Sequence, residues 1–319
     1  MAYPGARASK YVILFTLALG LTILFQPSVS AGTEAVSGSH QSRAPGEEHA
    51  EGASEAMKEV LEHEVVNTPY IHVAPLPKIP LPQFAPVTIA GIEIDFSITR
   101  HLVYLWIASL LTVLLMWVAA RQNKKRKVPR GWGNLVESVV QFIRDEIAQP
   151  ILGERYLKYM PILLSFFFLI SFMNLLGLVP FGALATANVS VTGGLTVVSF
   201  FVTQIAGIRA HGPFGYLFGL VPKGIPAVLW PLMFVIELIG VVTKFFALCI
   251  RLFANMLSGG LVIGAFYGLI FGLHSLAVAP LSLAFLLFMM LLKLFISLLQ
   301  AYIFTILTAF FVAIAVSHH

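Results

Sequence analysis

Three full charges stand within the otherwise apolar stretch 228–273, at Glu237, Lys244 and Arg251. They are spaced seven residues apart, and two heptads of an α-helix drift by only about 40°, so the three charges share one stripe. Asn255 follows Arg251 by one helical turn and continues the stripe. A charge at bilayer depth costs between about 3 and 17 kcal/mol, which makes Arg251 a candidate functional residue.

Arg251 has no acidic partner within reach on its own helix. Glu237 lies about 21 Å away along an α-helix, which is too far for an ion pair. From Pro161 to the C-terminus the sequence contains no other Asp or Glu. We therefore expect a carboxylate of another chain to meet Arg251. Because a guanidinium stays protonated in proteins, Arg251 is expected to organise proton movement without carrying the proton itself.

A second polar strip lies in the final apolar run, 281–316. It consists of Lys293, Ser297, Gln300 and Thr308. A glutamine buried near an arginine can hold the guanidinium by hydrogen bonds without cancelling its charge. Lys293 could titrate when buried and relay protons, or it could extend its stem toward headgroups, and both interpretations remain open.

These two stretches resemble a known family. Glu237, Lys244 and the run Arg251-Leu-Phe-Ala-Asn255-Met resemble the Arg-bearing helix of subunit a of the F-type ATP synthase. The run Leu298-Leu-Gln-Ala-Tyr-Ile-Phe, which contains Gln300, resembles the last helix of the same family. The resemblance extends from about Ile98 to the C-terminus.

The resemblance implies a non-catalytic, proton-translocating stator subunit of the Fo sector. It implies two offset half-channels beside a ring of c subunits, each with an essential carboxylate that meets Arg251. Other implied partners are the b subunits of the peripheral stalk and membrane lipid. No cofactor, metal or nucleic acid is expected, and the sequence lacks the Gly-rich phosphate-binding motif that ATP hydrolysis by this chain would need.

The resemblance also implies residues of a proton path. Glu237 is expected in the cytoplasmic half-channel, and Asn255 lies toward the periplasmic half. The further candidates are Lys244, Lys293, Ser297 and Gln300. The sequence departs from a common family pattern, because Gly260 and Lys293 stand where some members carry a Glu and a His.

Other interpretations remain open for the same residues. Glu237 and Lys244 could form a structural pair through a water. Small residues recur every seven positions at Gly240, Ala247 and Ala254, which is typical both of a contact surface for another chain and of an internal packing seam. A secondary transporter is the alternative function, although no internal repeat is present. A purely structural scaffold is the third.

Composition places the chain in the membrane. Hydrophobic residues make up 58% of the sequence, charged residues 11%, and the mean hydropathy is +0.88, which excludes an ordinary soluble globule. The net charge of +5 does not indicate nucleic acid, because the densest basic run, Lys124–Lys127, directly follows an apolar span. A single cysteine, Cys249, excludes an intrachain disulfide.

Three regions are expected along the chain. Residues 1–31 combine Arg7 and Lys10, an apolar run and small residues ending at Ala31, which predicts a signal peptide, with an uncleaved anchor as the alternative. Residues 32–94 form a polar, proline-punctuated periplasmic arm. Residues 95–319 form the membrane domain.

The predicted fold is an all-α polytopic membrane protein with about five membrane-crossing helices. Their expected ranges are 100–120, 161–179, 191–208, 228–273 and 281–316. The last two exceed a hydrocarbon core of about 30 Å, so they must tilt steeply, bend or break, and Gly259-Gly260 is the weakest point.

An amphipathic helix is expected at the membrane interface over Asn134 to Ile147, with Leu135, Val139, Phe142 and Ile143 on its apolar face. Between Arg121 and Lys158 there are nine Lys or Arg against four Asp or Glu, which predicts that this segment is cytoplasmic. The arm is then periplasmic and the C-terminus cytoplasmic, in a bacterial inner membrane.

Overall fold

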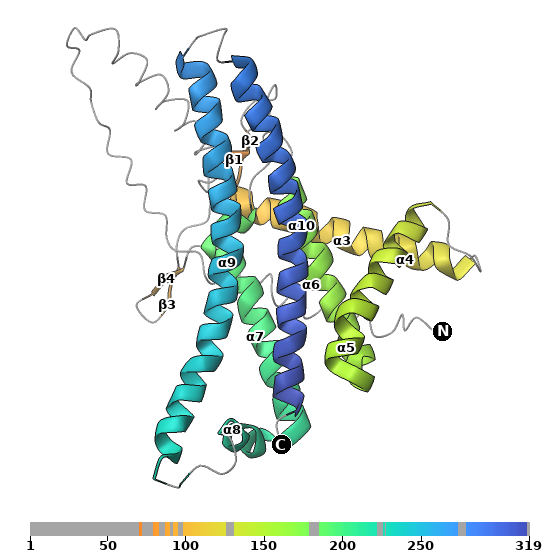
Figure 1. Cartoon of the computed structure of the whole chain (residues 1–319), viewed down its shortest axis with the longest axis vertical. Coiled ribbons are helices and arrows are strands. Elements are labelled where there is room, and N and C mark those ends of the chain that lie inside the picture. The colour runs from red at the N-terminus through yellow and green to blue at the C-terminus, as the bar shows by residue number, and fades with distance from the viewer. Residues whose placement is uncertain are drawn as a thin grey trace, which may run out of the picture.

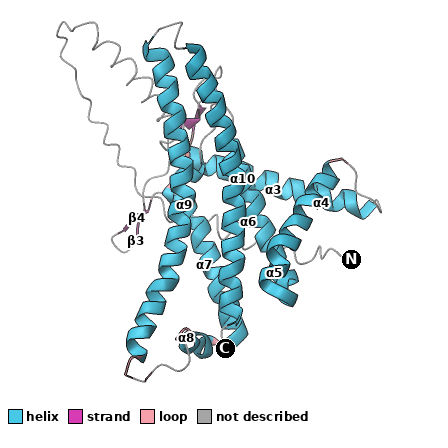
Figure 2. Cartoon of the chain, in the orientation of Figure 1, coloured by secondary structure: helices cyan, strands magenta, loops and turns pink. Residues whose placement is uncertain are grey.

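The computed structural model describes residues 70–71, 79–82, 87–89, 92–94, 98–125, 131–178, 185–221, 226, 228–273 and 279–317. The predicted signal peptide and most of the predicted arm lie outside the described residues. In the described part the chain is an all-α polytopic membrane protein, as predicted, and helices account for nearly all of it (Figures 1 and 2).

Within the described residues, five helices are long and apolar enough to cross a membrane. Four of them lie in α3 (Arg100–Lys125), α7 (Val189–His211), α9 (Trp230–Leu273) and α10 (Ala279–Ser317). The other one ends with α6 (Tyr156–Leu176). The predicted number of spans is confirmed. α6 begins at Tyr156, five residues before the predicted span, and continues through Pro161, which lies inside the helix.

The two longest helices are continuous. α9 has 44 residues and α10 has 39, and α9 passes through Gly259-Gly260 as regular α-helix. Of the three expected alternatives, a break is therefore excluded. A helix of this length measures about 66 Å, roughly twice the apolar core of a bilayer, so α9 cannot stand along the membrane normal. Figure 1 shows α9 and α10 as neighbours that run together from their connected ends and then diverge.

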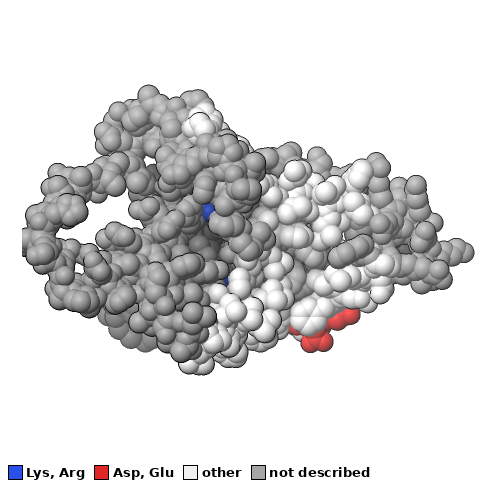
Figure 3. Space-filling model, turned by 90° about the horizontal axis from the view of Figure 1, so that it is seen from above, with Lys and Arg blue, Asp and Glu red and all other residues white. Residues whose placement is uncertain are grey.

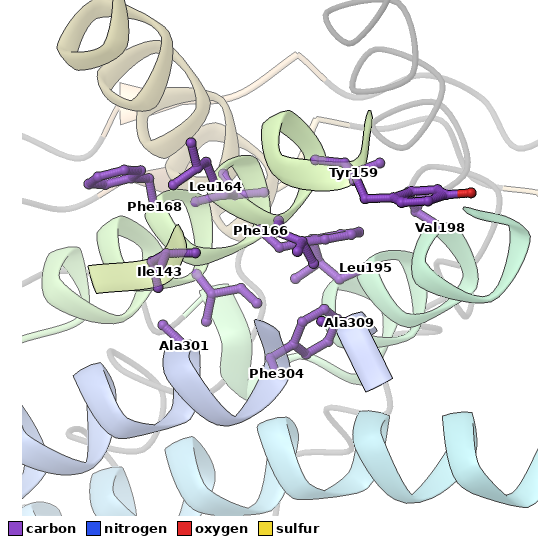
Figure 4. Close-up of a cluster of buried hydrophobic side chains, with 14 of the residues drawn as sticks. Ile143, Tyr159, Leu164, Phe166, Phe168, Leu195, Val198, Ala301, Phe304 and Ala309 are labelled. Atoms are coloured by element: carbon purple, nitrogen blue, oxygen red, sulfur yellow. The ribbon is translucent and has the colours of Figure 1, made fainter. Parts of the chain in front are cut away.

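The main apolar core lies where α6, α7 and α10 meet (Figure 4). The ring of Phe304 on α10 is fully buried and lies 5.3 Å from the ring of Phe166 on α6, measured between centroids. Leu195 and Val198 of α7 complete this part of the cluster. This core fixes α10 against the rest of the chain, and α9 then packs on α7 and α10.

A helix is present over the segment predicted to lie at the membrane interface. It comprises α4 (Trp132–Phe142), the π-helical turn η1 (Ile143–Ala148), α5 (Gln149–Leu152) and the short 3-10 turn η2 (Gly153–Arg155). Val136, Ile143 and Ile147 are buried against the rest of the chain, whereas Leu135 and Phe142 are exposed. The π-helical turn was not predicted, because the prediction assumed the regular helical period throughout.

Several short elements were not predicted. The segment expected as a turn between α7 and α9 contains α8 (Pro213–Gly219), which begins with Gly212 at a φ of +76° and Pro213 in the first helical position. A 3-10 turn, η3 (Ala185–Ala187), precedes α7.

The arm contains two short antiparallel hairpins. These pair β1 (Tyr70–Ile71) with β2 (Ile79–Pro80), and β3 (Val87–Ile89) with β4 (Ile92–Ile94).

Seen along its longest axis, the described surface is mostly uncharged, and its acidic side chains gather at one edge (Figure 3).

Candidate functional site

Arg251 lies on the exposed face of α9. Within the described part of the chain its guanidinium has no hydrogen-bond or ion-pair partner. Lys244, Ala247 and Ala254 are exposed on the same helix. The repeating small residues therefore do not form a packing seam inside this chain. They leave a shallow surface beside an unneutralised positive charge.

Asn255 joins α9 to α10. Its Nδ2 atom donates a hydrogen bond to Oε1 of Gln300 across a distance of 2.8 Å. Gln300 is only 1% exposed, and its own Nε2 atom is buried with no partner among the described residues. Gln300 is thus bonded to Asn255 and not, as the sequence suggested, to Arg251. The amide pair lies one helical turn beyond the arginine.

Lys293 faces the glycines of α9. Its side chain is 5% exposed, and a Cβ atom built on Gly259 would lie 3.5–3.7 Å from the Cγ, Cδ and Cε atoms of Lys293. Gly260 is buried next to this contact. Of the two positions at which the sequence departs from the common family pattern, Lys293 contacts Gly259, and Gly260 is the next residue along α9. The ammonium group of Lys293 is packed inside the protein and does not extend along the outer surface.

A chain of buried polar groups links α6, η3 and α10. Thr186 Oγ1 donates to Asn174 Oδ1 at 2.7 Å, and Asn174 Nδ2 donates to the carbonyl oxygen of Ser297 at 3.2 Å. All three residues are buried, and Ser297 Oγ has no partner in the described part of the chain. Asn188, by contrast, caps α7 by accepting from the Ser190 N–H. Asn174 is a helix-to-helix link and Asn188 is a helix cap.

Thr308, the last member of the predicted polar strip on α10, bonds to α7. Its Oγ1 atom lies 2.9 Å from Ser199 Oγ, and both side chains are fully buried. All four members of the strip are buried, so the strip faces the interior of the chain, away from the exposed face of α9 that carries Arg251.

A pocket of about 210 Å³ lies around Glu237, between α7, α8, α9 and α10. Lys244 also lines it, and no direct ion pair joins Glu237 to Lys244 in the described structure. The other polar residues in its wall are Thr203, Gln204 and Tyr216. Sequence reasoning missed these three, because a glutamine and a threonine in an apolar helix and a tyrosine in a glycine-rich turn are ordinary residues until the helices are brought together.

Arg251 thus lies between two polar regions. Glu237 and its pocket precede it along α9 by about 21 Å, whereas Asn255 follows it by about 6 Å. The first region opens beside α8 and the last turns of α10, and the second is built from Asn255, Gln300, Lys293 and Ser297. An unpaired arginine between two separated polar regions is suited to controlling the charge state of an acid that passes along α9.

The sequence matches a known protein family. Residues 102–313 match the family model described as ATP synthase A chain. The chain is 40% identical over 318 residues to ATP synthase subunit a 2 of Prosthecochloris aestuarii (strain DSM 271 / SK 413), covering 98% of this chain and 94% of that protein. It is 46% identical over 227 residues to ATP synthase subunit a of Chloroherpeton thalassium (strain ATCC 35110 / GB-78), covering 70% and 68% of the two chains.

A third relative gives a similar match. The chain is 46% identical over 230 residues to ATP synthase subunit a of Myxococcus xanthus (strain DK1622), covering 71% of this chain and 76% of that protein. The family model spans the helices that carry Arg251, Asn255, Lys293 and Gln300. This multi-pass membrane protein therefore belongs to the ATP synthase A chain family.

Proposed function

We propose that the chain is the proton-translocating stator subunit of the Fo sector of an F-type ATP synthase, a non-catalytic component that couples proton flow to rotation of a c ring. The observation that carries the proposal is the position of Arg251. It is an exposed arginine on an apolar helix, without an acidic partner in the described structure, between two polar regions.

The exposed faces of α9 and α10 are the proposed surface for the c ring. On α9 the small side chains of Ala247 and Ala254 flank Arg251, and small residues allow helices to approach closely in a membrane. On α10, Leu291 and Phe295 are more than 60% exposed. A cylinder of apolar helices, each carrying one carboxylate, matches the small side chains and the positive charge of Arg251 on this surface.

The proposed mechanism depends on the charge of Arg251. A ring carboxylate that reaches the guanidinium is held ionised, because a nearby positive charge favours the charged form of an acid. It releases its proton on one side of Arg251 and takes another from the opposite side before it re-enters lipid in the neutral form. Each proton that crosses the potential supplies about 2.3 kcal/mol per 100 mV. Arg251 also opposes a direct proton leak, because a fixed positive charge repels protons between the two regions.

Each polar region is assigned to one half-channel. The Glu237 pocket, with Lys244 in its wall, is the cytoplasmic one, because the basic segment 121–158 predicts that the C-terminal end of α10 is cytoplasmic. Asn255, Gln300, Lys293 and Ser297 belong to the periplasmic one. Gln300 Nε2 and Ser297 Oγ are buried polar atoms without a partner among the described residues, which supports water in this region.

The remaining assignments follow from the proposed orientation. Residues 1–31 are a signal peptide, residues 32–94 a periplasmic arm, and residues 95–319 the membrane domain of an inner-membrane protein. The b subunits of the peripheral stalk are the proposed static partners, and they prevent the chain from rotating with the ring.

Disulfide cross-linking tests the proposed ring surface. In a Cys249→Ala background, Ala254→Cys is paired with single cysteines along the outer helix of the c subunit in assembled membranes. We expect oxidation to give an a–c product in the Ala254→Cys protein. The matched control is Ala309→Cys, because Ala309 is fully buried against the rest of the chain and should not react. Equal cross-linking at both positions, or none at Ala254→Cys in an assembled complex, would overturn the proposed surface.

A further inference from the structure

The unpredicted helix α8 forms one wall of the Glu237 pocket. Tyr216 is 5% exposed, and it packs with Leu220, Val241 and Ala315 in a small apolar cluster that joins α8 to α9 and α10 (Figure 1). Both Tyr216 and Leu220 line the pocket. The place of α8 beside the last turns of α10 is therefore set by a packed tyrosine and not by the loop alone.

Gly207 on α7 fixes the position of the Tyr216 ring. A Cβ atom at this position would fall far inside van der Waals contact with the Cε2, Cδ2 and Cζ atoms of Tyr216. Only glycine allows the ring to lie directly on the α7 backbone. Gly207 lies about one helical turn beyond Gln204 on α7, and Gln204 and Tyr216 both line the pocket.

The phenol of Tyr216 lies near the amide of Gln204 in the pocket wall. Burial raises the pKa of Tyr216 above its ordinary value, and the nearby amide of Gln204 offsets part of that rise. The phenol therefore stays protonated at physiological pH. A neutral phenol both donates and accepts a hydrogen bond, as water does.

The pocket also contains an unsatisfied donor. The Nε2 atom of Gln204 is buried, and no group in the described part of the chain accepts a hydrogen bond from it. Buried polar atoms of this kind are commonly bonded to water. A pocket of about 210 Å³ with amide, phenol and hydroxyl groups in its wall is large and polar enough for several waters. Glu237 faces the same space.

We propose that Gln204 and Tyr216 are positioning residues of the proton path, which hold the water chain that connects Glu237 to the aqueous face beside α8. This inference rests on the proposed function, because it assigns Glu237 to a half-channel. In each transfer one O–H bond breaks on a donor water and one forms on its acceptor, ending on a carboxylate oxygen of Glu237. Gln204 and Tyr216 are unchanged at the end of each transfer.

Two substitutions test the proposal in the assembled complex. Tyr216→Phe removes the hydroxyl and keeps the ring on Gly207, and Gln204→Leu removes the amide with little change in volume. The matched control is Tyr302→Phe, which removes a phenol from α10 at a site that does not line the pocket. Passive proton conduction through F1-stripped vesicles is measured under a potassium diffusion potential while the pH on each side is varied separately.

We expect both variants to conduct protons about fivefold more slowly, the factor given by loss of one ordinary hydrogen bond. The loss should depend on the pH of the α8 side only, and c-ring co-purification should be unchanged. A purely structural role for Tyr216 would lower assembly without changing this pH dependence. Conduction by Tyr216→Phe equal to that of wild type and Tyr302→Phe overturns the proposal, even where Gln204→Leu fails to assemble.

The Glu237→Gln variant distinguishes the water-chain proposal from the half-channel assignment of Glu237 on which it rests. If Glu237→Gln conducts normally, the half-channel assignment of Glu237 is wrong and the water-chain proposal is overturned with it. If Glu237→Gln is impaired while Tyr216→Phe and Gln204→Leu are not, only the role of Gln204 and Tyr216 is wrong.

Discussion

The side chains of Asn255 and Gln300 are bonded to each other across the two longest helices, with Asn255 Nδ2 donating to Gln300 Oε1 at 2.8 Å. The bond lies one turn beyond Arg251, where α9 meets the buried strip of α10. It fixes the register of α9 against α10 next to the arginine. Arg251 can therefore be held on the outer face by a contact in which it takes no part.

This bond predicts coupling between its two partners. Asn255→Ala and Gln300→Ala should each weaken the α9–α10 interface, and the double variant should lose less than the sum of the two losses. We expect a coupling of about 0.6 kcal/mol, and at most about 1.7 kcal/mol, as for other hydrogen bonds between membrane helices. A double-mutant cycle read from the SDS concentration that unfolds the chain measures it. Strict additivity would mean that the bond contributes nothing.

Two glycine substitutions should have opposite outcomes. Gly207→Ala forces a methyl group into the Tyr216 ring, and overpacking of this kind costs about 1–3 kcal/mol. Gly259→Ala places its methyl at ordinary contact distance, 3.5 Å or more, from the Lys293 stem. We expect Gly207→Ala to lower the amount of assembled complex and Gly259→Ala to leave it near the wild-type level. Immunoblotting of purified complexes compares the two, and equal yields would show that the Tyr216 contact is not tight.

Lys293 is predicted to act through its titratable group. Lys293→Met keeps an unbranched apolar stem against Gly259 and removes the charge, so assembly should be retained while ATP-driven proton pumping falls. Lys293→His restores a titratable group and should recover part of the pumping, with a different dependence on periplasmic pH. Quenching of a pH-sensitive dye in inverted vesicles reports the rate. Full pumping by Lys293→Met would remove Lys293 from the proton path.

The Thr186–Asn174 bond predicts that a second substitution, at Asn174, causes no further loss of stability once Thr186 has been replaced. Thr186→Val leaves Asn174 Oδ1 buried without this donor, and an unsatisfied buried group costs about 1–3 kcal/mol. Replacing both partners in Thr186→Val/Asn174→Leu removes the unsatisfied group. We expect the double variant to be no less stable than Thr186→Val alone, measured by thermal aggregation of the detergent-solubilised complex. A double variant that is clearly less stable would indicate that the Asn174 bond to Ser297 matters more.

The membrane helices could be predicted from the sequence because their signal is local. α7 needed only a run of apolar residues ended by Arg209 and His211, and the length of α9 followed directly from the apolar stretch. The continuity of α9 through Gly259-Gly260 could not be predicted from the sequence, because two adjacent glycines weaken a helix. The helix continues because its backbone hydrogen bonds are retained in an apolar medium. The π-helical turn at Ile143 was not predicted, because the regular helical period was assumed throughout that segment.

The candidate site also contains some residues that could be identified from the sequence and others that could not. Arg251 stood out because a charge in an apolar helix is rare whatever surrounds it. The partner of Gln300 could not be identified from the sequence, because the choice between Arg251 and Asn255 depends on how α9 faces α10. Gln204 and Tyr216 carry no local signal, because Gly207 becomes informative only when α8 lies against α7.

ATP-driven acidification of inverted membrane vesicles that carry Arg251→Ala tests the central claim most directly, with wild type alongside and with c-ring co-purification as the check on assembly. The proposed mechanism predicts an assembled complex that no longer pumps protons, because nothing would then hold the ring carboxylate ionised between the two half-channels. Normal pumping by an assembled Arg251→Ala complex would contradict the half-channel mechanism and leave the arginine with a structural role.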